Sequence, residues 1–185
     1  MITAARPHPD FVERYRRERL EAQPTFAPGQ HSSSGYHRDA VGADLGNGAE
    51  VFERGRRALS TWTPHIEAGI QVFPAGAPIE VGSVVALLSR QMGLWVLAAC
   101  RITKVANEQM RFGFTYATLP DHPERGAESF FVTHNPDTGV IRYDIEATSQ
   151  PNGALAKVAS PIARRLQLRI TARYVEAMRR HSATE

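Results

Sequence analysis

The chain has 185 residues, 42% of them hydrophobic, which fits one globular domain large enough to enclose a core and a ligand cavity. Its formal charge of +3 comes almost wholly from arginine, because Lys104 and Lys157 are the only lysines. The arginines are interspersed with glutamates, so nucleic-acid binding is not expected. The single cysteine excludes an internal disulfide, and neither a secretory signal nor a membrane-spanning apolar run is present. We therefore expect a soluble cytoplasmic protein with no membrane partner.

Residues 9–22 are predicted to form a short charged helix, with Asp10 as its N-cap and Phe11, Tyr15 and Leu20 on a thin apolar stripe. A connector rich in proline, glycine and serine follows over residues 24–35. We interpret residues 1–35 as an N-terminal helical arm and linker, and residues 36–182 as the domain. The arm packs on the domain, packs on a second subunit of a homodimer, or forms a partly ordered tail.

The domain is expected to open with an edge strand over Tyr36–Leu45 and a helix over Ala49–Leu59. Gly46 and Gly48 between them resemble a dinucleotide-binding turn. That interpretation is rejected because the third glycine and the βαβ pattern are missing. Asn47 or Gly48 is better explained as a helix cap.

From Gly69 onward the hydrophobic period is that of strands, separated by turns rich in glycine, proline and asparagine. The six predicted strands are Ile70–Phe73, Gly82–Leu88, Leu94–Val105, Met110–Thr118, Glu128–His134 and Val140–Ala147. They form an antiparallel meander. Leu94–Val105 is apolar on both faces, which is typical of a central strand.

The chain ends in its longest predicted helix, which begins with Ser160 as a cap and Pro161 at the first helical position. Apolar residues recur every four positions along it, at Ile162, Leu166, Ile170, Tyr174 and Met178. Most of its arginines lie off this stripe. A solvated basic face is favoured over an anion site or an interaction surface.

This order of elements predicts an α+β helix-grip fold, in which a curved antiparallel sheet of about seven strands wraps around a long C-terminal helix. The arrangement is similar to that of the START and Bet v 1-like superfamily. In such proteins the space between sheet and helix commonly holds an apolar ligand. The resemblance implies a ligand cavity here.

Residues 112–131 carry the densest pattern in the chain. Phe112, Phe114 and Tyr116 lie at period two, which places three aromatic rings on one face of a strand. Two prolines and a glycine in Leu119–Gly126 then predict a rigid hairpin connection, which contains His122 and Glu124.

The same region resembles the signature of the DUF1990 family, also called UPF0548, through Thr118-Leu119-Pro120-x-His122-Pro123-Glu124-x-Gly126-x-Glu128-x-Phe130. Further matching segments are Leu45-Gly46-x-Gly48-x-x-x-Phe52-x-Arg54, Gly93-Leu94-Trp95, Cys100-Arg101-Ile102 and Asp137-x-Gly139. Ala117 and Ala127 depart from the pattern, where the family usually has glycine and an acid. The resemblance spans residues 36–180 and indicates a fold rather than a reaction.

His122, Glu124 and Tyr116 are the candidate catalytic residues, as an acid–base set at the edge of the sheet. The candidate ligand-binding residues are Phe112, Phe114, Glu128, Tyr143, Arg101, Ile162, Leu166 and Ile170. The structural alternative is that the His-Pro-Glu segment caps its turn, with glutamates accepting backbone N–H groups, and that the aromatic residues form core. No metal or other cofactor is predicted, because His, Asp and Glu residues are scattered without ligand spacing.

Two functions follow. The first is binding of a hydrophobic small molecule, lipid-like or polyketide-like. The second is a cofactor-independent cyclase, dehydratase or isomerase acting on a polyketide-type substrate. Binding is favoured because no strand shows an obvious cluster of ionisable residues. Titratable groups that converge inside the cavity would favour catalysis instead.

Overall fold

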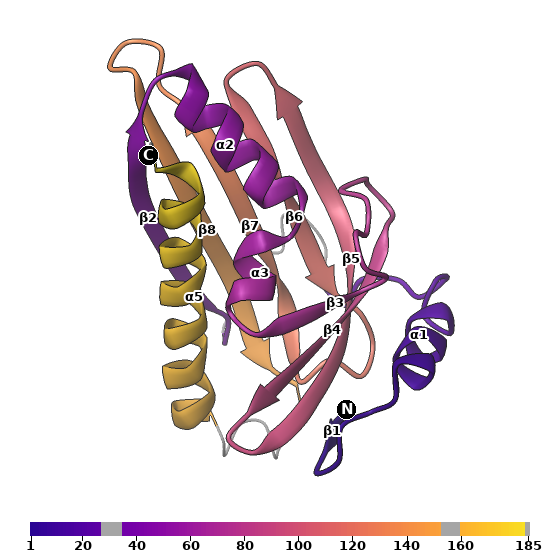
Figure 1. Ribbon diagram of the computed structural model, residues 1–185. Coiled ribbons are helices and arrows are strands. Elements are labelled where there is room, and N and C mark those ends of the chain that lie inside the picture. The colour runs from indigo at the N-terminus through magenta and orange to yellow at the C-terminus, as the bar shows by residue number, and fades with distance from the viewer. Residues whose placement is uncertain (27–34, 153–159, 184–185) are drawn as a thin grey trace.

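The computed structural model describes residues 1–26, 35–152 and 160–183, with side chains from residue 165 onward in the last range, and its centre is an eight-stranded antiparallel sheet (Figure 1). The strand order is β2-β8-β7-β6-β5-β4-β3, and β1 pairs with the start of β5. The strands are β1 Ile2–Thr3, β2 His37–Asn47, β3 Ile70–Phe73, β4 Val84–Gln91, β5 Leu94–Glu108, β6 Arg111–Thr118, β7 Glu124–His134 and β8 Val140–Pro151. From β3 to β8 each strand pairs with the next one along the chain, so the predicted meander is confirmed.

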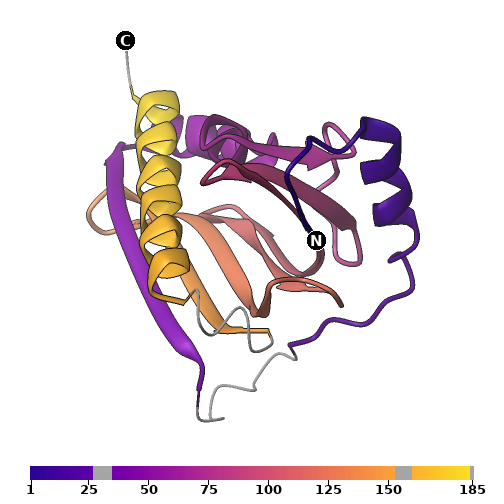
Figure 2. The same cartoon turned by 90° about the horizontal axis from the view of Figure 1, so that it is seen from below.

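Helices cover both faces of this sheet. The inner face carries α2 Ala49–Ser60, α3 Thr63–Glu67 and the long α5 Ser160–Ser182, whereas α1 Pro9–Arg17 lies against the outer face (Figures 1 and 2). Strand β5 has a core on each side: Cys100 and Ile102 face the inner helices, and Leu97 and Ala99 pack with α1. The prediction that this strand is central and buried on both faces is confirmed.

The inner core is aromatic at its centre. Trp62 adopts a left-handed backbone between α2 and α3, and its indole N–H donates to the carbonyl of Ala77 at 2.8 Å. Its ring lies 4.9 Å from that of Phe114. His65 of α3 is fully buried between Trp62, Phe130 and Tyr174. The turn from α2 into α3 therefore fills part of the space between the sheet and α5 with aromatic side chains.

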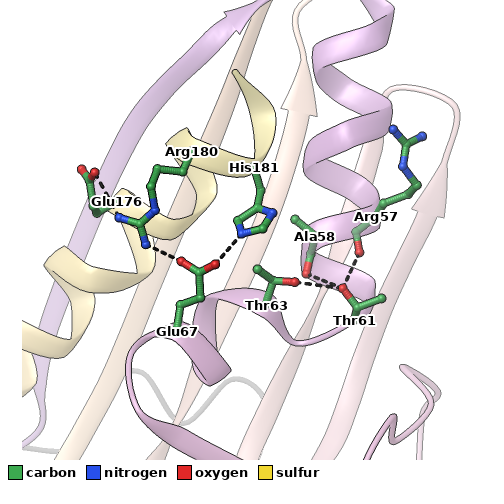
Figure 3. Close-up of polar contacts among 8 residues, drawn as sticks. All are labelled: Arg57, Ala58, Thr61, Thr63, Glu67, Glu176, Arg180 and His181. Carbon is green, nitrogen blue, oxygen red and sulfur yellow. Dashed lines mark hydrogen bonds and ion pairs between the residues drawn. The ribbon is translucent and has the colours of Figure 1, made fainter. Parts of the chain in front are cut away.

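The C-terminal end of α5 is fastened to α3 by charge (Figure 3). The carboxylate of Glu67, the last residue of α3, binds both Arg180 and His181. Arg54 of α2 adds a hydrogen bond to the carbonyl of Ser182 at 3.1 Å. Towards the start of the helix the packing is looser, and Leu168 is 47% exposed. Helix α5 is thus anchored near its C-terminal end, whereas its first described side chains are more exposed.

Most differences from the predicted elements lie in short segments. The two-residue β1 and the five-residue α3 were not predicted, so the sheet has eight strands. Strand β7 begins at Glu124 rather than Glu128, because its pairing with β8 continues to Pro151. Helix α1 ends at Arg17, and its N-cap is His8, whose Nδ1 accepts the N–H of Asp10 at 3.3 Å.

The N-terminal arm packs on the domain. Residues Val12 and Tyr15 of α1 are buried against the outer face of β4 and β5, whereas Leu20 is exposed. Thr25 donates to the carbonyl of Thr118 through both its N–H and its hydroxyl. The division of the chain into an arm and a domain at residue 35 stays a prediction. Among the described residues no helix is long and apolar enough to cross a membrane.

Candidate functional site

A cavity of about 680 Å³ lies between the sheet and the first half of α5. It occupies the part of the inner face that α2 and α3 do not reach. Its side walls are largely apolar and include Ile70, Leu87, Val96, Ala98, Leu166 and Ile170. Its polar lining includes Tyr116, His122, Glu124, Glu128, Ser149 and Asn152 from β6, β7, the loop before β7 and the end of β8, and further polar groups from β4 and α5, such as Ser89 and Thr171.

At the inner end of the cavity, a carboxyl group meets a phenol. Glu128 of β7 and Tyr116 of β6 are register partners, and the Tyr116 hydroxyl donates to Oε2 of Glu128 at 2.7 Å. The next inward-facing residue of β7 is Phe130, which is fully buried in the aromatic core. Glu128 therefore lies where the cavity meets the core.

The environment of Glu128 favours its neutral form. Its pKa is raised to about 7, mainly by burial; the Tyr116 hydrogen bond opposes this increase and Glu124 adds to it. Burial and the Glu128 carboxyl also raise the pKa values of Tyr116 and Tyr174, which stay protonated at neutral pH. A carboxyl group that titrates near neutrality and has no cationic neighbour among the described residues is suited to exchange protons.

A small recess of about 70 Å³ adjoins this carboxyl group. Its walls include Cys100, Thr118 and Gly126 in addition to groups that it shares with the main cavity. Gly126 lets β7 approach β8 closely, because a Cβ atom there would lie 2.1 Å from the carbonyl oxygen of Thr148. The recess has room for a small polar group or a water molecule.

The loop before β7 holds a neutral histidine against the same cavity. Nδ1 of His122 accepts the backbone N–H of Glu124 at 3.0 Å, and Asn152 donates to the His122 carbonyl at 2.9 Å. Burial lowers the pKa of His122 to about 4. Since Nδ1 is an acceptor, the proton of the neutral ring lies on Nε2. His122 thus offers a hydrogen-bond donor rather than a base.

Glu124 lies four residues before Glu128 on the same face of β7, near the start of β2. Burial raises its pKa, with a hydrogen bond from Ser149 acting in the opposite direction. Asp39 of β2 adds to the increase. The cavity wall therefore carries two carboxyl groups of raised pKa.

The structure brings together part of the predicted site. Tyr116, His122, Glu124, Glu128, Leu166 and Ile170 line the cavity. Tyr143 lies in the inner core beside it, with a buried hydroxyl that has no hydrogen-bond partner among the described residues. Ile162 belongs to α5, but its side chain is outside the described residues.

The remaining predicted ligand contacts lie elsewhere. Phe112 and Phe114 are on the inner face as expected, but α2 and Trp62 cover them, so they are core. Arg101 points to the outer face, because its neighbour Cys100 points inward. There it donates to the carbonyls of Gly82 and Ala22 at 3.0 and 3.1 Å.

Sequence reasoning missed several lining residues. Ser149 and Pro151 line the cavity because β8 extends to Pro151 and the alternation that places Ile145 inward continues through them, and Asn152 follows directly after the strand. Met1 and Ile2 line it because β1 pairs with β5. The alternation in β8 could have predicted Ser149. Among the described residues, no group of three His, Cys, Asp or Glu side chains is placed to hold a metal.

A sheet that wraps a C-terminal helix over an apolar cavity defines a helix-grip protein. Solved structures of similar fold agree with this assignment. A hypothetical protein from Helicobacter pylori has a TM-score of 0.59 at 8% identity and covers 84% of this chain and 92% of that chain. The Zhui aromatase/cyclase from Streptomyces sp. R1128 has a TM-score of 0.57 at 9% identity, covering 80% of this chain and 93% of that chain. At these identities the likeness shows the fold alone.

Sequence comparison places the chain within a family. The profile of the Domain of unknown function (DUF1990) matches residues 20–177. A UPF0548 protein of Dictyostelium discoideum is 31% identical over 145 residues, which cover 72% of this chain and 67% of that protein. The chain therefore belongs to the DUF1990, or UPF0548, family, and the resemblance seen in its sequence is confirmed.

Proposed function

We propose that this protein binds a largely apolar small molecule, lipid-like or polyketide-like, in the cavity between the sheet and α5. The observation that carries the proposal is the cavity itself. Its volume of about 680 Å³ is in the range of small-molecule sites, its walls are largely apolar, and one cluster of its polar groups lies along β7 and the loop before it. An aromatase/cyclase among the proteins of similar fold supports the use of such a cavity by a small molecule.

Native mass spectrometry of the purified protein, followed by denaturation, tests this proposal. We expect a co-purifying apolar compound, or thermal stabilisation by members of a library of apolar compounds. Ile170→Glu places a carboxylate on the cavity wall and should abolish either signal. Leu168→Glu on the exposed face of α5 is the matched control and should keep it. A clean apo mass together with no stabilisation would contradict the proposal.

A second candidate is a cofactor-independent cyclase, dehydratase or isomerase that acts on the bound molecule. The observation that favours it is the convergence of titratable groups on one cavity: His122 as a neutral donor, Glu124 with a raised pKa, and Tyr116 bonded to Glu128. Such groups could move protons while the cavity holds the substrate folded.

A binding protein and an enzyme can be told apart by whether the bound compound is converted. An enzyme should convert the co-purifying compound or a related polyketide-like molecule, and His122→Ala and Glu124→Gln should each slow the reaction by about 100-fold or more. Binding should change far less in these variants. If wild-type protein returns the compound unchanged after prolonged incubation across pH 5 to 9, the binding function alone remains.

A further inference from the structure

Glu128 carries a partly buried carboxyl group, and among the described residues no cation faces it. The described titratable groups around it are Tyr116 of β6, Cys100 of β5, Tyr143 of β8, Tyr174 of α5, Glu124 of its own strand and the neutral His122 of the loop before β7. None of them carries a positive charge. Carboxyl groups withdrawn from bulk water are normally paired with a cation or satisfied by several donors, so Glu128, which lines the cavity, has capacity for a further partner.

The Glu128 carboxyl group also accepts fewer hydrogen bonds from the described residues than it could. Tyr116 donates to Oε2, and among the described residues no other group donates to either oxygen. A carboxyl group can accept several hydrogen bonds. The recess of about 70 Å³ beside it gives a ligand atom access to the free positions.

The walls near Glu128 are aromatic and suit a planar ligand. Tyr116 and Tyr174 both line the cavity. Behind them, the ring of Phe130 lies 5.5 Å from Tyr116 and 5.6 Å from Tyr174. A flat aromatic or conjugated group can stack or make edge contacts with such rings.

We propose that Glu128, Tyr116 and Tyr174 form a recognition site for a phenolic or enolic hydroxyl group of the ligand, which donates its O–H to the Glu128 carboxyl. This inference rests on the proposed binding function and names the chemistry that the cavity selects. A neutral hydroxyl suits the site better than an ammonium group. It can pair with the carboxyl group in either protonation state, whereas an ammonium group needs the carboxylate and must itself be desolvated.

Three probes of similar size distinguish these chemistries: 2-naphthol, 2-methylnaphthalene and 2-(aminomethyl)naphthalene. Their dissociation constants would be measured by calorimetry on the full chain. We expect wild-type protein to prefer 2-naphthol over 2-methylnaphthalene by about tenfold or more, as a hydrogen bond to a buried carboxyl group predicts.

Glu128→Met removes the acceptor at similar side-chain size, and it should reduce the preference to about twofold or less while 2-methylnaphthalene still binds. Retained binding of that probe also shows that the variant is folded. Glu128→Gln keeps an acceptor oxygen and should restore most of the preference. Glu146→Met, on the opposite face of the neighbouring strand, is the matched control and should behave as wild type.

The binding results distinguish failure of the hydroxyl site from failure of the proposed binding function. Equal binding of naphthol and methylnaphthalene to wild-type protein would overturn the hydroxyl site and leave the apolar cavity intact. Tightest binding of the amine, lost in Glu128→Met, would overturn the assignment in favour of a cation site. Failure of all three probes to bind folded protein would overturn this inference. Together with a clean apo mass and no stabilisation by the wider library, it would also overturn the proposed binding function.

Discussion

The backbone N–H of Glu124 donates a hydrogen bond of 3.0 Å to Nδ1 of His122, and this bond determines the state of the ring. The bond requires an unprotonated Nδ1, and burial lowers the pKa of His122 to about 4. We therefore expect the neutral tautomer with its proton on Nε2 throughout pH 5 to 8. Nitrogen-detected NMR of the imidazole should show one protonated nitrogen and no titration in that range. A midpoint near 6.5 would show that the ring does not hold this bond.

Arg101 fastens the N-terminal arm to the outer face of the sheet. Its guanidinium group donates to the carbonyls of Leu20 and Ala22, just after α1, and to Gly82 before β4. Arg101→Met keeps most of the apolar stem but removes all three bonds. We expect backbone amides of residues 9–22 to exchange with solvent about tenfold faster or more, with little change in ligand affinity. Arg90→Met, an exposed arginine on β4, is the control.

If the exchange of residues 9–22 is unchanged in Arg101→Met, the arm is held by its other contacts, such as the buried Val12 and Tyr15, rather than by Arg101. A large loss of ligand affinity in this variant would instead support the interior role that the sequence predicted for Arg101.

Glu67 links α3 to the end of α5 through Arg180 and His181 (Figure 3). These hydrogen bonds, that from His181 most, hold the pKa of Glu67 below its usual value. A carboxyl group with a lowered folded-state pKa stabilises the fold above its unfolded pKa, and this stability is lost as the pH falls through the folded value. Glu67→Gln should therefore lower the free energy of unfolding by up to about 1 kcal/mol at pH 7.

Urea denaturation of wild type and Glu67→Gln at pH 7 and at pH 2 to 3 checks this expectation. The difference should shrink at the lower pH, as wild-type Glu67 becomes protonated. Glu50→Gln is the control, because Glu50 is exposed and its one ion pair among the described residues, with Arg54, is 3.7 Å long. A difference that persists at low pH would mean that the effect comes from packing rather than charge.

Much of the fold could be predicted from the spacing of apolar residues. The long strands and α5 each bury one face, so their apolar residues recur at a regular interval in the sequence. Strand β1 has two residues and α3 has five, too few for any period. Alternation also placed Phe112, Phe114 and Tyr116 on one face correctly. It could not show that Trp62 covers Phe114 while Tyr116 stays open to the cavity, because this depends on where α2 turns into α3.

The candidate site was predicted less completely, for reasons of hydrogen-bond direction and chain pairing. The His-Pro-Glu segment does cap its turn, but His122 is the acceptor and Glu124 supplies the backbone N–H. Both side chains can accept, so sequence could not choose between them. The raised pKa of Glu128 likewise depends on burial between strands, which no local pattern reveals.

His65 makes the fold sensitive to acid. Its ring is fully buried, neither nitrogen has a hydrogen-bond partner among the described residues, and burial lowers its pKa to about 3. The unfolded chain binds a proton below about 6.5 while the folded chain does not, so stability falls as the pH drops towards 3. From pH 7.5 to pH 5 this loss amounts to about 2 kcal/mol.

His65→Leu should remove that loss and raise the free energy of unfolding at pH 7.5 by about 1 kcal/mol, because an apolar side chain of similar size replaces two unsatisfied polar atoms. Urea denaturation at both pH values measures the two effects. Ile66→Leu, at a 57% exposed position of the same helix, should leave both unchanged. A His65→Leu variant less stable than wild type at pH 7.5 would show that the imidazole nitrogens have a stabilising partner in solution, such as a buried water.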